Sequence, residues 1–104
     1  MAITSTELTT SNPTTVFTAA SQTVISTVYI CNYTAGNVTV DIHAIAGNSV
    51  AAGNSNAIYN DYPVGANDTL VLDTEKIILD TTDVIQVACS NASAVTVTVS
   101  SYSI

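Results

Sequence analysis

The sequence has no tryptophan or arginine, one histidine, one phenylalanine and two prolines in 104 residues. Lys76 is its single cation, opposed by eight carboxylates, and the net charge is −7. Proteins bind nucleic acids by neutralising phosphates with Lys and Arg, so we expect no nucleic-acid binding. Anionic membrane surfaces are disfavoured for the same reason. A basic protein surface or a metal ion remains compatible with this charge.

The sequence also lacks the segments that direct a chain to or across a membrane. Its first ten residues carry neither the basic stretch nor the apolar stretch of a secretory signal peptide. No apolar run approaches the about 20 residues that a membrane-spanning helix needs. We therefore expect synthesis in the cytoplasm, with no secretion signal and no membrane partner.

What the sequence contains in quantity is apolar and hydroxyl side chains. Hydrophobic residues make up 47% of the chain and charged residues 9%, which argues against disorder. Ser and Thr supply much of the remaining polarity, and such charge-poor surfaces are typical of interfaces. The length allows one core, so we predict a single domain over residues 1–104. Residues 1–15, rich in Ser and Thr, are predicted to form a loosely held N-terminal arm, with docking on a neighbour as the functional alternative.

The fold class follows from side chains that alternate along the chain. Valine alternates with hydroxyl residues through 95–100, and Val38, Val40 and Ile42 alternate with polar residues. A period of two in β-branched residues predicts strands with one face in a core. Helical periodicity is missing from every long window. Turn residues separate candidate strands near 2–8, 15–19, 23–32, 37–46, 57–62, 69–73, 76–79, 84–90 and 94–103.

Many short strands without a helix indicate a β-sandwich or a small barrel. We predict an all-β protein, an antiparallel β-sandwich of about eight strands, either jelly-roll or immunoglobulin-like. A turn is expected over residues 63–68. The predicted core residues are Leu70, Leu72, Ile77, Leu79, Ile85, Val87, Val95, Val97 and Val99.

Two cysteines and one histidine are the candidate nucleophiles and base. The separation of Cys31 and Cys89 resembles that of the immunoglobulin disulfide, but there is no Trp, and Val87 stands where Tyr is expected. We expect two packed, free thiols, with a disulfide as the alternative. His43 falls on the polar face of its strand, where a surface or interface role is expected before a role as base or ligand. No motif pairs it with a thiol, so we predict no catalytic residues and no enzyme.

Carboxylates are frequent in the second half of the chain, where loop oxygens could bind calcium. However, the spacing of an EF-hand is absent, and most of these residues flank turns, where Asp bonds its own backbone. We therefore predict no metal site and no cofactor. The residues concerned are Asp61, Asp68, Asp73, Glu75, Asp80 and Asp83.

Five tyrosines are present beside a single phenylalanine. Tyr is enriched at protein interfaces because it combines apolar contact area with a polar tip. Tyr59 and Tyr62 lie next to Asp61 and Pro63 near a strand end. We predict these four residues as an interface, with ordinary packing in the sheet as the alternative reading. The N-terminal arm is the second candidate surface.

Four segments of the chain share a pattern: VYICN (28–32), an early central strand, then AIYNDYPV (57–64), ANDTL (66–70) and TDVIQV (82–87). Together they resemble a small virion-protein domain of tailed bacteriophages. In that group a Tyr-rich strand leads to a D-x-P turn and an Asn/Gly-Asp turn, and a hydroxyl/valine strand closes the chain. The similarity covers roughly residues 20–104.

The resemblance implies a non-enzymatic virion protein. It would be a head decoration (cement) protein that binds and stabilises capsid subunits, or else a neck, tail or fibre component. Its partners would be the major capsid protein or neck and tail proteins, and its location the virion. Such proteins form symmetric oligomers, and trimers suit decoration sites. A carbohydrate-binding module is the alternative from another class, which the absence of Trp weakens.

Overall fold

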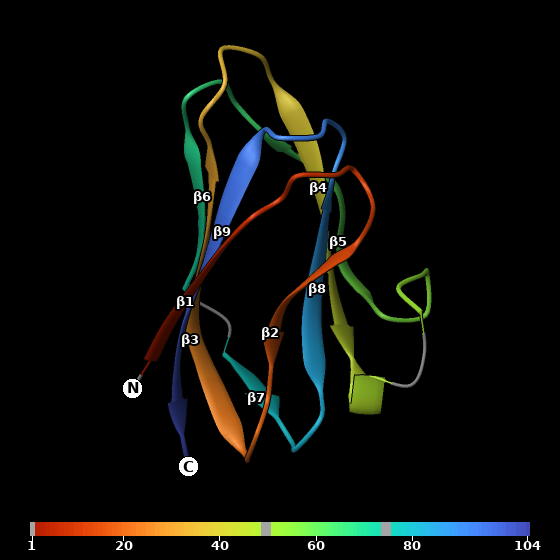
Figure 1. Ribbon diagram of the computed structural model, residues 1–104, viewed down its shortest axis with the longest axis vertical. Coiled ribbons are helices and arrows are strands. Elements are labelled where there is room, and N and C mark those ends of the chain that lie inside the picture. The colour runs from red at the N-terminus through yellow and green to blue at the C-terminus, as the bar shows by residue number, and fades with distance from the viewer. Residues whose placement is uncertain (1, 49–50, 74–75) are drawn as a thin grey trace.

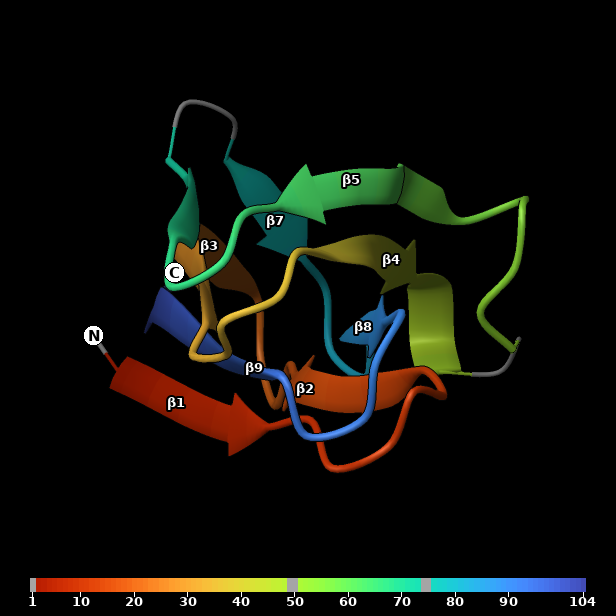
Figure 2. The ribbon, with the colours of Figure 1, turned by 90° about the horizontal axis from the view of Figure 1, so that it is seen from above.

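The computed structural model describes residues 2–48, 51–73 and 76–104, which form two layers of strands (Figure 1, Figure 2). The described ranges contain no helix with the length and hydropathy that crossing a bilayer requires. The elements are β1 (Ala2–Glu7), β2 (Thr14–Thr18), β3 (Thr23–Asn32), β4 (Val38–Ile45), the 3-10 turn η1 (Ala46–Asn48), β5 (Ala57–Val64), β6 (Thr69–Leu72), β7 (Ile77–Leu79), β8 (Val84–Cys89) and β9 (Val95–Ser103).

The strands pair as a long hairpin folded over on itself. The first strand pairs with the last, β2 with β8, β3 with both β6 and β7, and β4 with β5, all antiparallel. The five-stranded sheet has the order β1-β9-β3-β6, with β7 also on β3, and the four-stranded sheet has the order β2-β8-β4-β5. This nested pairing, divided between two sheets, is a jelly roll. The predicted antiparallel sandwich is confirmed, and the strand order selects one of its two predicted types.

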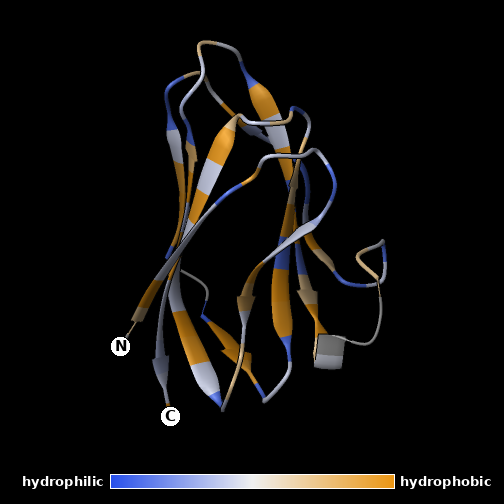
Figure 3. Ribbon diagram, in the orientation of Figure 1, coloured by the Kyte–Doolittle hydropathy of each residue, from blue (hydrophilic) through white to orange (hydrophobic). Residues whose placement is uncertain are grey.

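Aliphatic side chains fill the space between the sheets, and Figure 3 shows the alternation as orange and paler bands along β9. Six of the nine predicted core residues are buried, among them the three valines of β9, each 0% exposed. Burial of a Val or Leu side chain contributes roughly 1.5–3 kcal/mol, so these strands supply much of the folding free energy. The three others pack against the core from half-buried positions: Leu70, Leu72 and Ile77.

The turn predicted to begin at Pro63 begins later, so that prediction was wrong by two residues. Pro63 lies opposite Thr39, and Val64, which is buried, lies opposite Val38. The strand continues through Pro63 because β5 is the edge of its sheet, where a missing N–H need not cost a ladder hydrogen bond. The chain turns after Gly65, where the N–H of Asp68 donates to the Gly65 carbonyl.

The segment predicted as an arm contains strand residues of both sheets. Residues 2–7 form β1, which keeps an unbroken register with β9. Leu8 follows with 0% exposure and belongs to the core. Thr14 and Thr15 begin β2 and pair with β8. Met1 lies outside the described residues.

Candidate interaction surfaces

Tyr59 and Tyr62 meet on β5 because the strand is bulged between them. Residues three apart on a regular strand point to opposite faces. Here Tyr59 lies opposite Ile42 and Tyr62 opposite Val40, so three steps on β5 match two on β4. The ring centroids are 5.2 Å apart and the planes are inclined by 64°, an edge-to-face contact. Tyr59 packs against the core, whereas Tyr62 is 40% exposed.

The other two residues of the predicted interface shape the edge of β5. Asp61 takes a positive φ of 51°, and its N–H donates to Oδ1 of Asp41 at 2.6 Å. Pro63 is exposed and has no N–H to offer. Both features interrupt the regular row of edge amides. The structure therefore brings the two tyrosines together and places Asp61 and Pro63 as obstacles to strand addition at this edge.

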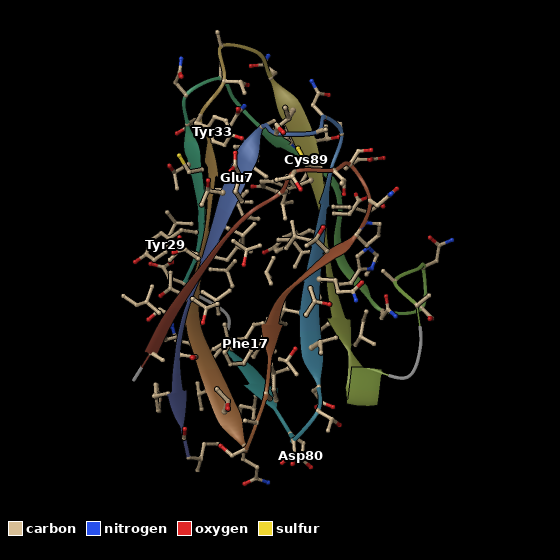
Figure 4. The ribbon with its side chains drawn as sticks, in the orientation of Figure 1. Glu7, Phe17, Tyr29, Tyr33, Asp80 and Cys89 are labelled. Carbon is tan, nitrogen blue, oxygen red and sulfur yellow. The ribbon has the colours of Figure 1, made fainter. Side chains whose placement is uncertain are left out.

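A second surface, which the sequence reading missed, is the outer face of the five-stranded sheet. Tyr29 lies opposite Val71, and Val24 lies opposite both Ile78 and Tyr102. The exposed apolar residues on this face are Ile3 (72%), Tyr29 (41%), Val71 (45%), Ile78 (69%) and Tyr102 (44%). They belong to five different strands, so the strand order gathers them onto one face. Figure 4 shows Tyr29 on this side, away from the four-stranded sheet.

Hydroxyl side chains separate these apolar residues, and one strand residue among them is charged. Ser5, Thr98 and Ser100 occupy neighbouring outward positions, and the hydroxyls of Ser5 and Thr98 are 3.2 Å apart. Glu7 is the single charged residue at an outward strand position of this sheet. Its Oε2 accepts a hydrogen bond from the Tyr33 hydroxyl at 2.6 Å (Figure 4). This bond to Glu7, with smaller effects of desolvation and of nearby charge, raises the pKa of Tyr33 to about 12.

The outer face of the four-stranded sheet differs because a loop covers part of it. His43 is on this face, as its alternation predicts, but it is 7% exposed and therefore not the surface residue that was expected. Its Nδ1 lies 2.9 Å from Oδ1 of Asn56, which also accepts from the Gly53 N–H. The Asn56 oxygen is thus an acceptor, so Nδ1 of His43 carries a proton. Asn56 donates in turn to the Ala51 carbonyl. The histidine holds a loop against the sheet.

Asp83 fastens η1 to the turn between β7 and β8. Its Oδ2 accepts from the Asp80 N–H at 2.9 Å, and its Oδ1 accepts from the Gly47 N–H at 2.7 Å. These two bonds, the first being the larger effect, lower the pKa of Asp83 against a smaller opposing effect of desolvation. The turn reading of this carboxylate from the sequence agrees with its contacts.

The thiols and the imidazole lie apart. Both cysteines are free; Cys89 is buried in the core, and Cys31 is exposed on the outer face of the other sheet, so only one of them is packed as expected. His43 is on the opposite side of the sandwich from Cys31. Among the described residues, no three His, Cys, Asp or Glu side chains are grouped to hold a metal ion. Glu75, one of the predicted turn carboxylates, lies outside the described residues.

Comparison with known proteins yields one weak structural likeness. No protein-family model matches the chain, and no curated protein matches its sequence. The chain is similar to part of a structure of infectious bursal disease virus, Gx strain, at 12% identity and a TM-score of 0.42. The match covers 97% of this chain and 29% of that one. A likeness of this degree says nothing about what this chain does.

Proposed function

We propose that this chain is a non-enzymatic structural protein of a virus particle, and that it binds and stabilises neighbouring capsid subunits as a decoration protein. The observation that carries the proposal is the outer face of the five-stranded sheet, where hydroxyls surround five exposed apolar side chains. Exposed apolar patches mark interaction sites, and the cores of protein interfaces are poor in charge and rich in Tyr.

Because this face carries little charge, covering it with a partner costs little desolvation free energy. Burying an unpaired carboxylate or ammonium group at an interface costs several kcal/mol, on the order of the affinity of a weak complex. Glu7 lies at the end of β1 and already accepts a hydrogen bond from Tyr33. The remaining outward side chains are apolar or hydroxyl-bearing and lose little when they leave water. A partner that covers the face therefore takes one charged strand residue, Glu7, out of water, and the Tyr33 hydroxyl replaces part of the water bound to it.

Two further points support the virion assignment. Residues 57–64 and 82–87 resemble the small virion proteins of tailed bacteriophages. The jelly roll also recurs in viral capsid and lectin domains, which is support by fold analogy alone. A neck, tail or fibre protein would use the same adhesive face on a different neighbour.

The test uses two tyrosines of matched exposure on the two candidate surfaces. Tyr29 (41% exposed) is on the outer face of the five-stranded sheet, and Tyr62 (40% exposed) is in the β5 cluster. We expect the wild-type protein to co-sediment with capsids assembled from the major capsid protein of the same virus. Tyr29→Ser is expected to weaken this binding about tenfold or more, as loss of an interface hot spot does. Tyr62→Ser is expected to change the dissociation constant less than threefold, which corresponds to a change in binding free energy below roughly 0.7 kcal/mol.

Each result has a distinct meaning. Loss of binding with Tyr62→Ser alone would keep the decoration role and move the interface to the β5 cluster. Co-purification with tail or fibre proteins in place of capsids would select the neck or tail alternative. Absence of binding to any virion protein, together with specific binding on a glycan array, would overturn the proposal in favour of a carbohydrate-binding module.

A further inference from the structure

The four edges of the sandwich differ in how open they are to another strand. At β5, the bulge at Asp61 and the ring of Pro63 interrupt the edge. The register of β2 shifts between Thr15 and Phe17. The remaining edge is formed by two short strands, β6 with four residues and β7 with three. A charge also lies there, because Lys76 donates to the backbone of β3 beside these strands. Such bulges, prolines, charges and short strands are the usual means of blocking edge-to-edge pairing.

The edge of β1 has none of these obstacles. All six of its residues pair with β9 in an unbroken register, and residues 2–6 carry no charge, Pro or Gly. Glu7, at the end of the strand, is its one charged residue. A regular, uncharged, exposed edge strand is a template for pairing with another strand.

The hydrogen bonds next to β1 show which main-chain groups face outward. The N–H of Leu8 donates to the Val95 carbonyl of β9 at 3.0 Å. Because these groups alternate in direction along a strand, those of Ile3, Ser5 and Glu7 point away from β9. No described residue bonds their N–H or C=O groups. Three residues of β1 thus offer three donors and three acceptors along the open edge.

The distribution of charge indicates that a second copy of this chain is the occupant. Four carboxylates lie on or beside β4, β5 and β6, namely Asp41, Asp61, Asp68 and Asp73. Asp80 and Asp83 lie in the turn between β7 and β8, and the strands β1 and β2 contain one carboxylate, that of Glu7. Figure 2 shows β1 and β2 on the side of the sandwich opposite β5. Two copies, each of net charge −7, repel least when they meet through their β1 edges. A basic partner, in contrast, gains nothing at this edge.

The strand is also complementary to itself. When two β1 strands run antiparallel with Ser5 opposite Ser5 of the second copy, Ile3 lies opposite Glu7 on both sides. This register lets all three outward residues bond in both chains, and the symmetry axis passes beside Ser5. A two-fold axis perpendicular to the sheet keeps each side chain on its own face. Ile3 therefore stays on the outer face, where the aliphatic part of Glu7 from the second copy lies beside it.

A groove beneath β1 would be extended by the same contact. It has a volume of about 300 Å³ and lies between the β1 and β2 edges, where it is lined by Thr4, Thr6, Thr15, Val16, Phe17 and Thr18. Figure 4 shows Phe17 on the side of β2 toward the five-stranded sheet. In the register above, Thr4 lies opposite Thr6 of the second copy. The inward threonines of the second copy therefore continue the groove wall that Thr4 and Thr6 form in the first copy.

We propose that two copies of this chain dimerise through β1, antiparallel about a two-fold axis beside Ser5, to form one continuous sheet. The dimer places two adhesive outer faces side by side and makes the protein bivalent. The inference does not rest on the capsid proposal, because its test uses the isolated protein.

The first test is sedimentation velocity over a range of protein concentrations. We expect a concentration-dependent dimer. Ser5→Pro removes an outward N–H that β9 does not use, so the monomer is expected to keep its fold by circular dichroism while the dimer weakens about tenfold or more. Ser5→Asp, which sets two carboxylates together at the axis beside the two Glu7 residues, is expected to do the same, and Ser5→Ala is expected to leave the dimer intact. A wild-type protein that is monomeric throughout, or a trimer, would overturn the proposal.

Cross-linking tests the register independently. In a Cys31→Ser background, Ser5→Cys places two thiols across the axis, with Cα atoms within the about 4.4–6.8 Å that a disulfide spans. The control is Thr98→Cys, one strand further in, beside Ser5 but beyond reach of its mate. Oxidation is expected to link the first variant and leave the second monomeric on a denaturing gel. Equal linking of both variants, or of neither in a protein that dimerises, would refute the β1 contact.

Discussion

Replacement of Asn32 by Asp should be among the most damaging isosteric changes in this protein. The side chain is 0% exposed, at the end of β3. Its Nδ2 donates to the carbonyls of Gly36 at 2.8 Å, Gly65 at 3.1 Å and Val64 at 3.2 Å, while its Oδ1 accepts from the N–H and hydroxyl of Thr34. One amide therefore ties the β3–β4 loop to the end of β5.

In Asn32→Asp an oxygen replaces the donating nitrogen and faces three carbonyl oxygens. The variant loses the two N–H donors that the three carbonyls share, at about 1 kcal/mol each, and buries a charge among acceptors. We expect a loss of about 3–5 kcal/mol at neutral pH, a large part of the 5–15 kcal/mol typical of a domain. Asn32→Ala removes the same donors without a charge and is expected to cost less, about 2–4 kcal/mol.

The pH dependence separates the two variants. A protonated carboxyl can still donate one hydrogen bond, so the fold should hold the introduced carboxyl at a pKa above its unfolded value of about 3.9. Its contribution is then fully present below that value and lost as the pH rises through the folded pKa. Urea unfolding from pH 3 to 8 should show Asn32→Asp losing stability relative to Asn32→Ala over this range. Parallel profiles, or an Asp variant within about 1 kcal/mol of wild type at pH 7, would refute the reasoning.

Two further changes test the carboxylate contacts. The pKa of Tyr33 is raised from its ordinary 10.0 to about 12, so its contribution to stability is present below pH 10 and lost as the pH rises toward 12. The difference in unfolding free energy between wild type and Tyr33→Phe should shrink over that interval, and a constant difference would contradict the Glu7 bond. The pKa of Asp83 is lowered, so the advantage of wild type over Asp83→Asn should be present above the ordinary value of 3.8 and vanish at lower pH. Acid titration of the thermal midpoint measures it, and an advantage that persists at the lowest pH would show that the bonds to Asp80 and Gly47 do not depend on charge.

Local patterning predicted the strands well because each strand carries its own signal. The alternation of Val95, Val97 and Val99 with hydroxyls requires no knowledge of neighbours, and the segment forms β9 with its valines buried. Strand pairing is different, because the contact of β1 with β9 joins opposite ends of the chain. Hydrophobic alternation is the same for any partner, so the sequence left the jelly roll and the immunoglobulin-like order equally open.

The candidate surfaces show the same division between local and non-local information. The Tyr59–Tyr62 contact depends on a bulge, and a strict period of two places these rings on opposite faces. The outer apolar face depends on strand order. Tyr29 lies in β3 and Ile78 lies in β7, which is distant in the sequence but pairs with β3. The sequence placed His43 on the correct face. Its burial could not be predicted, because the covering loop is held by a hydrogen bond to Asn56, and no sequence motif indicates that bond.

Edge chemistry sets how each side of the molecule can bind. Pro63 and the bulge at Asp61 prevent the edge of β5 from extending its sheet, so a partner there must be recognised by side chains. Those side chains are two tyrosines and nearby carboxylates, which favour a basic surface. The open amides of β1 favour a strand, and the apolar outer face favours a flat, uncharged surface. Because a strand at the β1 edge would use main-chain groups and a surface on the outer face would use side chains, the proposed dimer and the proposed adhesion to a larger neighbour are compatible.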